Sequence, residues 1–248
     1  ALVAAAYAQR HEGGIGGRGG VLRMATVAAA LWLAPAILGA VTVWLDLPPL
    51  VVVAHLALAM GLLGVLAVTV IRAGGFGAMT LKSSTVDPRS ARSALGAAAL
   101  AFVVVVMGGL TANLPGAAPA CQGFPLCNGG IVTEGTAQTI HWVHRLSAFL
   151  LTLHVLGMTM AAGKRGEGVM RRATIVLLGV IGLQIVIAAI LVSAHLPKAL
   201  QSAHQAVGTL VWLGAVVVAG LGARGAESAK SADRPPSALS APSALSAP

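Results

Sequence analysis

The sequence predicts an all-α protein, a polytopic membrane helical bundle, from its composition and from the length of its apolar runs. Hydrophobic residues make up 57% of the 248 residues and charged residues only 9%, and the mean hydropathy is +0.88. Several apolar runs of about twenty residues are long enough to cross a bilayer as helices. The spans must be helical, because hydrocarbon offers backbone groups no partner and no run alternates like a lipid-facing barrel strand.

Six spans account for most of the chain. Residues 1–9 are also apolar and resemble the last turns of a further helix, so we expect the chain to be truncated at its start. The tail is rich in Pro, Ser and Ala and repeats PSALSAP, which predicts a disordered extension from about residue 225. The six expected helices cover residues 21–45, 49–72, 92–112, 139–163, 170–194 and 198–222.

The distribution of positive charge predicts the orientation of these spans. Fourteen of the sixteen Lys and Arg residues lie on one side, and only Lys198 and Arg145 lie on the other. Because cytoplasmic loops carry the excess of Lys and Arg, we expect both termini in the cytoplasm and the loops 46–49, 113–138 and 195–198 outside. The net charge of +9 follows from this topology and from contact with the lipid bilayer, so it calls for no nucleic-acid partner.

The two cysteines of the chain lie in one outward loop. Cys121 and Cys127 belong to the segment CQGFPLCNGG, and an oxidising compartment favours a disulfide between them. Two other interpretations stay open, a pair of inert thiols and a metal or redox pair. The second is weakened because no set of His and Cys with zinc spacing accompanies the two cysteines.

A repeated motif is the most informative feature of the sequence. Leu-Pro, five residues and Ala-His occur at residues 47–55 and again at residues 196–204, at an offset of 149. Each copy follows one long apolar run and opens the next. The repeat therefore predicts a helical hairpin that is used twice, each time with one histidine inside the membrane.

Three histidines are predicted to share one layer of the bundle. His55, His144 and His204 each lie about six residues inside a span, which corresponds to roughly 9 Å from the outer surface. An ionisable side chain at such a depth is costly unless it has a partner, which favours a functional role over satisfied packing of the core. Neutral imidazole is a good iron ligand, and facing histidines of a four-helix bundle can hold a haem.

The residues around these histidines allow more than one interpretation. Arg145 directly follows His144, and its guanidinium is expected either to bind a haem propionate or to extend to the lipid headgroups. His141 lies one helical turn before His144, as a candidate proton carrier or support for its neighbour. His154 has no histidine at its depth on another span, which disfavours a second haem, and His195 is expected at the interface.

Four motifs follow one another along the chain. They are the hairpin LGAVTVWLDLPPLVVVAH, the loop VMGGLTANLPGAAPACQGFPLC, the run HWVHRLSAFLLTLH and the second hairpin ending in ALQSAHQ. In this order they make the chain similar to the haem A synthase family of bacterial and mitochondrial membrane proteins. The similarity covers residues from about 30 to 215, most of the chain that we expect to be ordered.

The resemblance implies eight helices in two pseudo-symmetric four-helix bundles, of which this chain has six helices. The C-terminal bundle would hold a permanent haem b between His144 and His204, with Arg145 beside it and a structural disulfide between Cys121 and Cys127. The N-terminal bundle would take haem O as substrate at His55, the catalytic residue, whose partner histidine would precede residue 1. The implied division is a truncated helix and loop (1–20), half of the substrate bundle (21–72), a linker (73–91), the haem b bundle (92–222) and a tail (223–248).

The reaction implied by the resemblance is oxidation of a ring methyl of haem O to the formyl group of haem A, through hydroxylations and loss of water. The expected enzyme is an oxidoreductase of cytochrome oxidase biogenesis in a bacterial plasma membrane, and this fragment is expected to be inactive alone. Haem O synthase and the machinery that assembles the oxidase are its implied partners. Alternatively, the same histidines would serve a membrane b-type cytochrome that only carries electrons, or the proton relay of a transporter.

Overall fold

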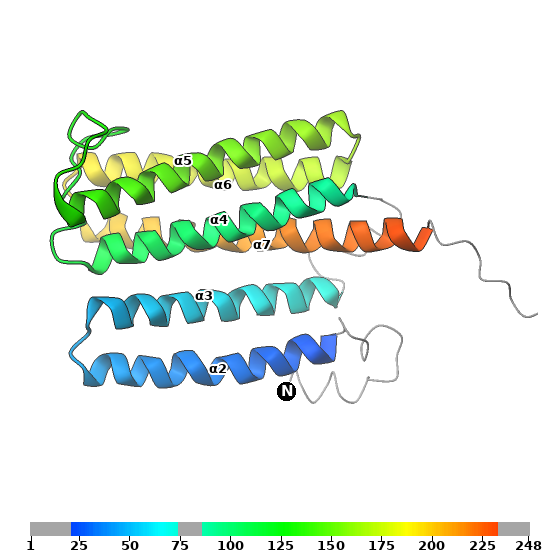
Figure 1. Cartoon of the computed structure of the whole chain (residues 1–248), viewed down its shortest axis with the longest axis horizontal. Coiled ribbons are helices and arrows are strands. Elements are labelled where there is room, and N and C mark those ends of the chain that lie inside the picture. The colour runs from blue at the N-terminus through cyan, green and yellow to red at the C-terminus, as the bar shows by residue number, and fades with distance from the viewer. Residues whose placement is uncertain (1–20, 74–85, 233–248) are drawn as a thin grey trace, which may run out of the picture.

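The computed structural model of the protein describes residues 21–73 and 86–232, and within these ranges it is built from helices (Figure 1). All six are long and apolar enough to cross a membrane, which confirms the predicted fold class. The expectations for residues 1–20, most of the linker and the last residues of the tail lie outside the described ranges. The helices are α2 (Val21–Trp44), α3 (Pro49–Arg72), α4 (Pro88–Asn113), α5 (Gly135–Lys164), α6 (Gly168–Ser193) and α7 (Lys198–Ala232).

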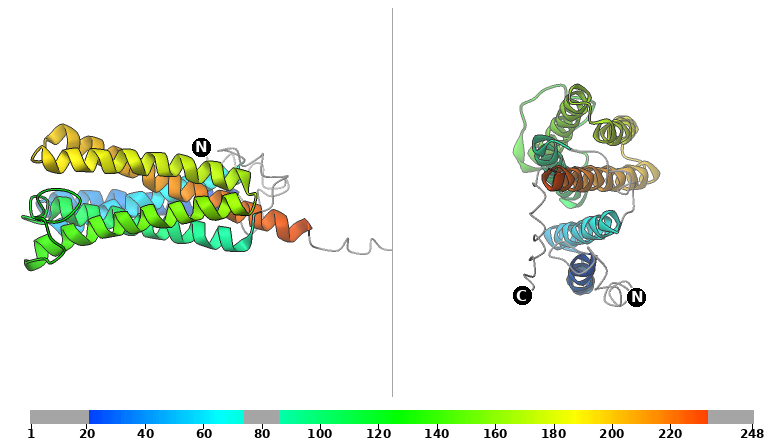
Figure 2. Two further views of the ribbon diagram at one scale, coloured as in Figure 1. Left: turned by 90° about the horizontal axis from the view of Figure 1, so that it is seen from above. Right: turned by 90° about the vertical axis from the view of Figure 1, so that its right-hand side faces the viewer.

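Four of the helices form a closed bundle and the other two form a pair beside it. In the bundle, α4 packs against α5, α5 against α6, α6 against α7, and α7 against α4. The pair consists of α2 and α3, and only α3 faces the bundle, where it contacts both α4 and α7. The end-on view in Figure 2 shows α2 on the far side of α3 from the four-helix bundle.

Small side chains allow close contact between the helices of the bundle. The buried residues of α4 include Ala94, Ala97, Ala98 and Ala101. In lipid, where the hydrophobic effect does not drive helices together, such small residues permit the close van der Waals contact that does. Many leucines and valines of the same helices are exposed, because their environment is hydrocarbon.

Two helices begin earlier than the apolar runs indicate. The α4 helix starts at Pro88 rather than at residue 92, because Asp87 accepts a hydrogen bond from the Arg89 N–H at 2.7 Å and proline suits the first helical turn. The α5 helix starts at Gly135 rather than at residue 139. Its first turn is polar, so hydropathy alone did not include that turn in the span.

The last helix continues farther than the sequence analysis expected. Residues 223–232, which we assigned to a disordered tail, continue α7 to Ala232. Four of its ten residues are alanine, the residue that most favours helix. It is also tied to the end of α3, because the Arg224 side chain donates to the Ile71 and Arg72 carbonyls at 2.6 and 3.2 Å.

The two copies of the repeated motif have the same backbone. Residues 46 and 47 have φ of 57° and 60°, and residues 195 and 196 have φ of 59° and 63°. In both turns the first of these N–H groups bonds to the carbonyl three residues back at 3.2 Å, and the second to the carbonyl five residues back at 2.9 Å. This pattern closes the helix that ends and directs the chain into the next one. His55 and His204 therefore lie at the same position, six residues after the first residue of α3 and of α7.

Candidate functional site

His144 on α5 and His204 on α7 face each other across the bundle. Their ring centroids lie 6.4 Å apart, and the ring planes are inclined at 82°. Two metal–nitrogen bonds of about 2 Å, with about 1.2 Å from each nitrogen to its ring centroid, also give a separation of about 6.4 Å. The centroid separation thus equals that of two rings whose nitrogens point at one metal ion, and His204 Nε2 would exchange its contact with Gln184 for the metal.

A bare metal ion would find too few ligands at this pair. Within residues 21–73 and 86–232, no three His, Cys, Asp or Glu side chains gather into a metal site. Two imidazoles alone leave most positions of a transition metal open. A metal held here must therefore bring further ligands of its own, as the four nitrogens of a porphyrin do.

The ring of His144 is held in one orientation by α4. Its Nδ1 donates to the Val104 carbonyl at 3.1 Å. Because a carbonyl oxygen only accepts, Nδ1 carries the proton and Nε2 keeps a lone pair that can bind a metal. Gly108 makes this contact possible, since a Cβ there would lie 3.0 Å from His144 Cε1.

The ring of His204 is less completely satisfied. Its Nε2 accepts a long hydrogen bond of 3.3 Å from the Gln184 amide, which also donates to the His204 carbonyl at 2.9 Å. His204 Nδ1 and Gln184 Oε1 are both buried without a hydrogen-bond partner. A histidine that only fills a core is normally paired, so these two atoms favour a binding site over plain packing.

His55 lies apart from this pair. It is half-buried on α3 and packs on Gly39 of α2, where a Cβ would lie 3.0 Å from its Cε1. Its Nδ1 is buried without a partner. Of the imidazoles that the structure describes, only His144 and His204 form a ring contact with each other, so His55 faces no second histidine there.

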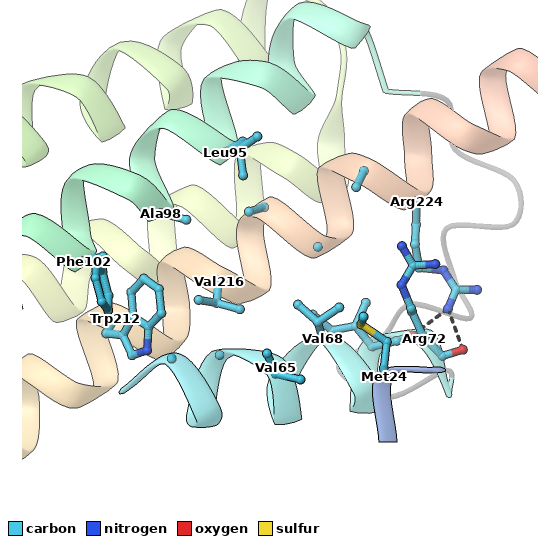
Figure 3. Close-up of a pocket in the computed structure, with 16 residues that line it drawn as sticks. Met24, Val65, Val68, Arg72, Leu95, Ala98, Phe102, Trp212, Val216 and Arg224 are labelled. Carbon is cyan, nitrogen blue, oxygen red and sulfur yellow. Dashed lines mark hydrogen bonds between the residues drawn. The ribbon is translucent and has the colours of Figure 1, made fainter. Parts of the chain in front are cut away.

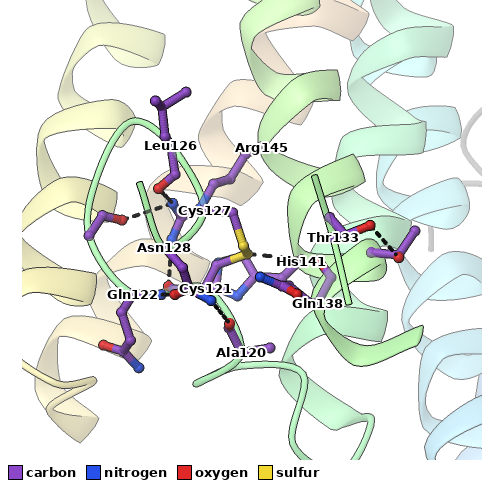
Figure 4. Close-up of a disulfide and its surroundings, with 12 residues drawn as sticks. Ala120, Cys121, Gln122, Leu126, Cys127, Asn128, Thr133, Gln138, His141 and Arg145 are labelled. Atoms are coloured by element: carbon purple, nitrogen blue, oxygen red, sulfur yellow. Dashed lines mark hydrogen bonds between the residues drawn. A yellow bond between two sulfur atoms is a disulfide. The ribbon is translucent and has the colours of Figure 1, made fainter. Parts of the chain in front are cut away.

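Arg145 is buried under the loop between α4 and α5, with only 6% of its surface exposed. Its guanidinium donates to the carbonyls of Cys121, Gly123 and Leu126 at 2.8, 2.8 and 2.9 Å (Figure 4). The side chain therefore does not extend to the headgroups. It organises the loop above the histidine pair and has two of its five N–H groups left for another acceptor.

The same loop is also closed covalently. Cys121 and Cys127 form a disulfide and are both buried. Within the loop, the Asn128 side chain accepts a hydrogen bond from the Gln122 N–H at 2.8 Å and donates to the Ala120 carbonyl at 3.2 Å. The disulfide loop thus covers the first turns of α5, with Arg145 beneath it.

The other histidines of the described chain have ordinary partners or are exposed. His141 is buried and its Nδ1 donates to the Ala117 carbonyl at 3.0 Å. His154 Nε2 donates to the Ser93 carbonyl at 2.9 Å. His195 is exposed in the turn before α7. The remaining candidate, His11, lies outside the described residues.

Comparison with known proteins identifies the family. A family model described as COX15-CtaA, cytochrome oxidase assembly protein, matches residues 1–216. The chain belongs to this family. COX15-CtaA proteins are the haem A synthase family, so the resemblance carried by the four motifs is confirmed.

Beyond the COX15-CtaA match, the chain is similar to part of two archaeal proteins named protoheme IX farnesyltransferase. It is 33% identical to that of Haloarcula marismortui over 123 residues, which cover 49% of this chain and 26% of the relative. It is 35% identical to that of Halobacterium salinarum over 97 residues, which cover 38% of this chain and 21% of the relative. The matched segments span about a quarter of these relatives or less.

Two parts of the site in this COX15-CtaA chain were missed by sequence reasoning. They are Gln184, the amide that reaches His204, and Gly108, which leaves room for His144. Gly208, a small residue that the sequence already placed beside the site, leaves room for Gln184, since a Cβ there would lie 3.1 Å from Gln184 Nε2. Gln184 could have been identified from the sequence, because it is a lone amide side chain in α6, the most hydrophobic of the six spans.

Proposed function

We propose that this chain binds a haem b between His144 and His204 and works as the haem-binding part of a haem A synthase. The observation that carries the proposal is the 6.4 Å separation of the two rings, which would allow both imidazoles to hold one iron. Membership of the COX15-CtaA family supports it, because the family serves cytochrome oxidase assembly.

The residues around the pair fit such a cofactor. Val104 fixes the His144 tautomer that leaves Nε2 as a ligand, and the unpaired atoms of His204 and Gln184 mark a site that protein groups do not fill. When bound, the haem supplies redox chemistry. The chain supplies two neutral ligands, an apolar surrounding that excludes water, and Arg145, whose two remaining N–H groups suit a propionate.

On the substrate side, the proposal places haem O at His55. The His55 ring packs on Gly39, and its buried Nδ1 has no protein partner, which supports a role for this imidazole beyond packing. The reaction would convert a ring methyl of haem O into the formyl group of haem A. The relatives named protoheme IX farnesyltransferase support a place beside the enzyme that makes haem O, and the oxidase under assembly would receive the product.

The proposed location is a bacterial plasma membrane with both termini in the cytoplasm. Arg72, Arg224 and Lys164 lie at the helix ends opposite the disulfide loop, as the positive-inside rule expects of the cytoplasmic side. The loop closed by Cys121 and Cys127 would then face the oxidising compartment, where a disulfide persists.

The spectrum of the purified protein tests this proposal. We expect His144→Ala and His204→Ala each to abolish a low-spin bis-histidine haem spectrum, because each removes one axial ligand. His154→Ala is the matched control, since that ring bonds to Ser93 and not to the pair. A low-spin spectrum that survives His204→Ala without a substitute ligand would contradict the assignment.

His55→Ala separates the two sites and the two classes of function. It should leave the bound haem b spectrum unchanged and stop conversion of haem O in membranes that contain the complete protein. A membrane b-type cytochrome would use the same His144 and His204, but it would show no conversion of haem O with or without His55. Chromatography of extracted haems distinguishes these outcomes.

A further inference from the structure

An apolar cavity of about 400 Å³ lies between the α2–α3 pair and the four-helix bundle. Its walls come mainly from α3, α4 and α7 (Figure 3). The lining residues include Arg72 at the end of α3, so the cavity lies on the half of the molecule away from the disulfide loop. The volume falls within the range of roughly 300–1,000 Å³ that is usual for small-ligand sites. None of the histidines discussed above lines it.

The two ends of the cavity differ in chemistry. At the end nearer the middle of the helices, Trp212 packs against Phe102 with ring centroids 5.3 Å apart, and its indole N–H donates to the Met60 carbonyl at 2.9 Å. At the other end lie the side chains of Arg72 and Arg224. The cavity is thus closed at one end by the rings of Trp212 and Phe102 and carries two guanidinium groups at the other end.

The length of the cavity corresponds to one leaflet of a bilayer. Trp212 and Arg224 are twelve residues apart on α7, which is about 18 Å at the rise of an α-helix. Half of a hydrocarbon core of about 30 Å is about 15 Å. Arg72 is the last residue of α3, so both arginines lie where the apolar spans end and headgroups begin.

The arginines carry positive charge into a fixed position. Arg224 is held by its bonds to the Ile71 and Arg72 carbonyls, and Arg72 lies 3.9 Å from Glu227, which is itself largely exposed. Among the described residues, the partners of Arg224 are carbonyl oxygens, which carry no charge, so its positive charge is retained at this end. An anionic group matches it, and phosphate is a favoured partner of arginine.

We propose that this cavity binds one phospholipid of the leaflet opposite the disulfide loop, with an anionic headgroup at Arg72 and Arg224. One acyl chain lies along the apolar wall and ends against Trp212. Such a lipid fills the space between α3 and the bundle and so joins the pair to the four other helices. The inference is independent of the proposed haem chemistry, since it uses neither His144, His204 nor His55.

Native mass spectrometry of the protein in mild detergent tests this site. We expect about one phospholipid to remain bound per chain, and phosphatidylglycerol to be preferred over phosphatidylcholine with the same acyl chains. Arg72→Gln should reduce that preference about fivefold, the effect expected of one arginine at a membrane surface. Equal retention of the two lipids by the unsubstituted protein would overturn the proposal.

A cavity-filling variant provides the second arm. A Cβ at Gly61 meets nothing within 4 Å, so Gly61→Leu occupies the cavity without a clash and should abolish the bound lipid. Gly179→Leu is the matched control, because Gly179 lies on α6 in equally open space away from the cavity. Circular dichroism checks that both variants are folded. If Gly61→Leu unfolds, the preference of the unsubstituted protein for phosphatidylglycerol over phosphatidylcholine still tests the proposal.

Two results of this arm would refute the site. One is a Gly61→Leu variant that keeps as much phospholipid as the unsubstituted protein. The other is displacement of the lipid by glycerol phosphate at concentrations similar to those of the intact lipid, because a headgroup without a chain does not use the apolar wall.

Discussion

At the scale of single residues, the histidine pair depends on two glycines, which have no side chain, as much as on the residues that hydrogen-bond to the rings. Gly108 leaves the Val104 carbonyl accessible to His144 Nδ1, and Gly208 leaves the His204 carbonyl accessible to Gln184. In both cases the glycine lies four residues after the accepting carbonyl. That carbonyl already accepts the helical bond of the glycine N–H, and only the absence of a Cβ exposes its other lone pair.

Gly108→Leu tests the first of these contacts. The new side chain would begin 3.0 Å from His144 Cε1 and displace the ring, so we expect a large loss of bound haem in the pyridine haemochrome assay. Gly157→Leu on the same bundle meets nothing within 4 Å and should keep the haem. Equal haem content in the two variants would contradict the role given to Gly108.

Gln184→Leu tests the second contact. It removes the hydrogen bond to the His204 carbonyl, worth about 1 kcal/mol, so we expect haem to bind roughly fivefold more weakly in a titration followed at the Soret band. The long bond to His204 Nε2 is not counted, because it occupies the lone pair that a metal would take. Gln205→Leu, an exposed neighbour, is the control. Unchanged haem affinity in Gln184→Leu would show that the amide does not support His204.

The candidate ligands could be predicted from the sequence, but the residues that hydrogen-bond to those ligands could not. Histidines in apolar spans are visible because burying an ionisable group demands a reason. The partners of His144 and His204 come from α4 and α6, and which helix lies against which depends on tertiary packing that no local pattern carries. Arg145 illustrates the same point, because its three acceptors lie 19 to 24 residues earlier in the chain.

At the scale of elements, hydropathy located the helices well and their ends poorly. The apolar runs gave all six spans because the bilayer sets their length and composition. The first turns of α4 and α5 and the last turns of α7 are polar. They are fixed by a cap and by contacts such as that of Arg224 with α3, which hydropathy does not register.

The repeated turn makes a testable prediction about strain. Asp46 and His195 have φ near +60°, a region that costs a residue with a side chain about 1–2 kcal/mol. We therefore expect Asp46→Gly and His195→Gly to leave the protein as stable or to stabilise it by up to about 1 kcal/mol. Unfolding in detergent measures this. Ala161→Gly inside α5 should instead destabilise the protein by about 1 kcal/mol, and a similar loss at the turn would contradict the interpretation.

The disulfide loop makes a second prediction at this scale. Arg145→Gln removes the donor of three loop carbonyls, and an unpaired buried carbonyl costs about 1–3 kcal/mol. We expect the loop to open more often and dithiothreitol to reduce the Cys121–Cys127 bond at least tenfold faster, as followed by thiol alkylation. Arg92→Gln, an exposed arginine on α4, should keep the original rate. Equal rates in the two variants would show that Arg145 does not hold the loop.

At the scale of the whole molecule, the α2–α3 pair is joined to the bundle through one face of α3. The sequence suggested repeated hairpins, but it did not show that α3 would lie against both α4 and α7. Gly64 permits that approach, since a Cβ there would lie 3.0 Å from the Trp212 ring. The same indole donates to the Met60 carbonyl across the interface.

Trp212→Phe should loosen this joint. It removes the indole donor and leaves the Met60 carbonyl with its helical bond only, so we expect faster amide hydrogen exchange in α3 and α2 by mass spectrometry. Exchange in α5 and α6 should be unchanged. Trp142→Phe on α5 is the control, and equal exchange of α3 in both variants would contradict a joint at Trp212.

The length of α7 has a mechanical consequence. His204 and Trp212 are eight residues apart on one continuous helix, a distance of about 12 Å, and Arg224 follows three turns later. The single helix α7 thus contains a proposed iron ligand, His204, and also Trp212 and Arg224, which hydrogen-bond to α3. A rotation of α7 at His204 must also turn Trp212 and Arg224. A conformational change at the histidine pair is therefore coupled to the contact between α7 and α3.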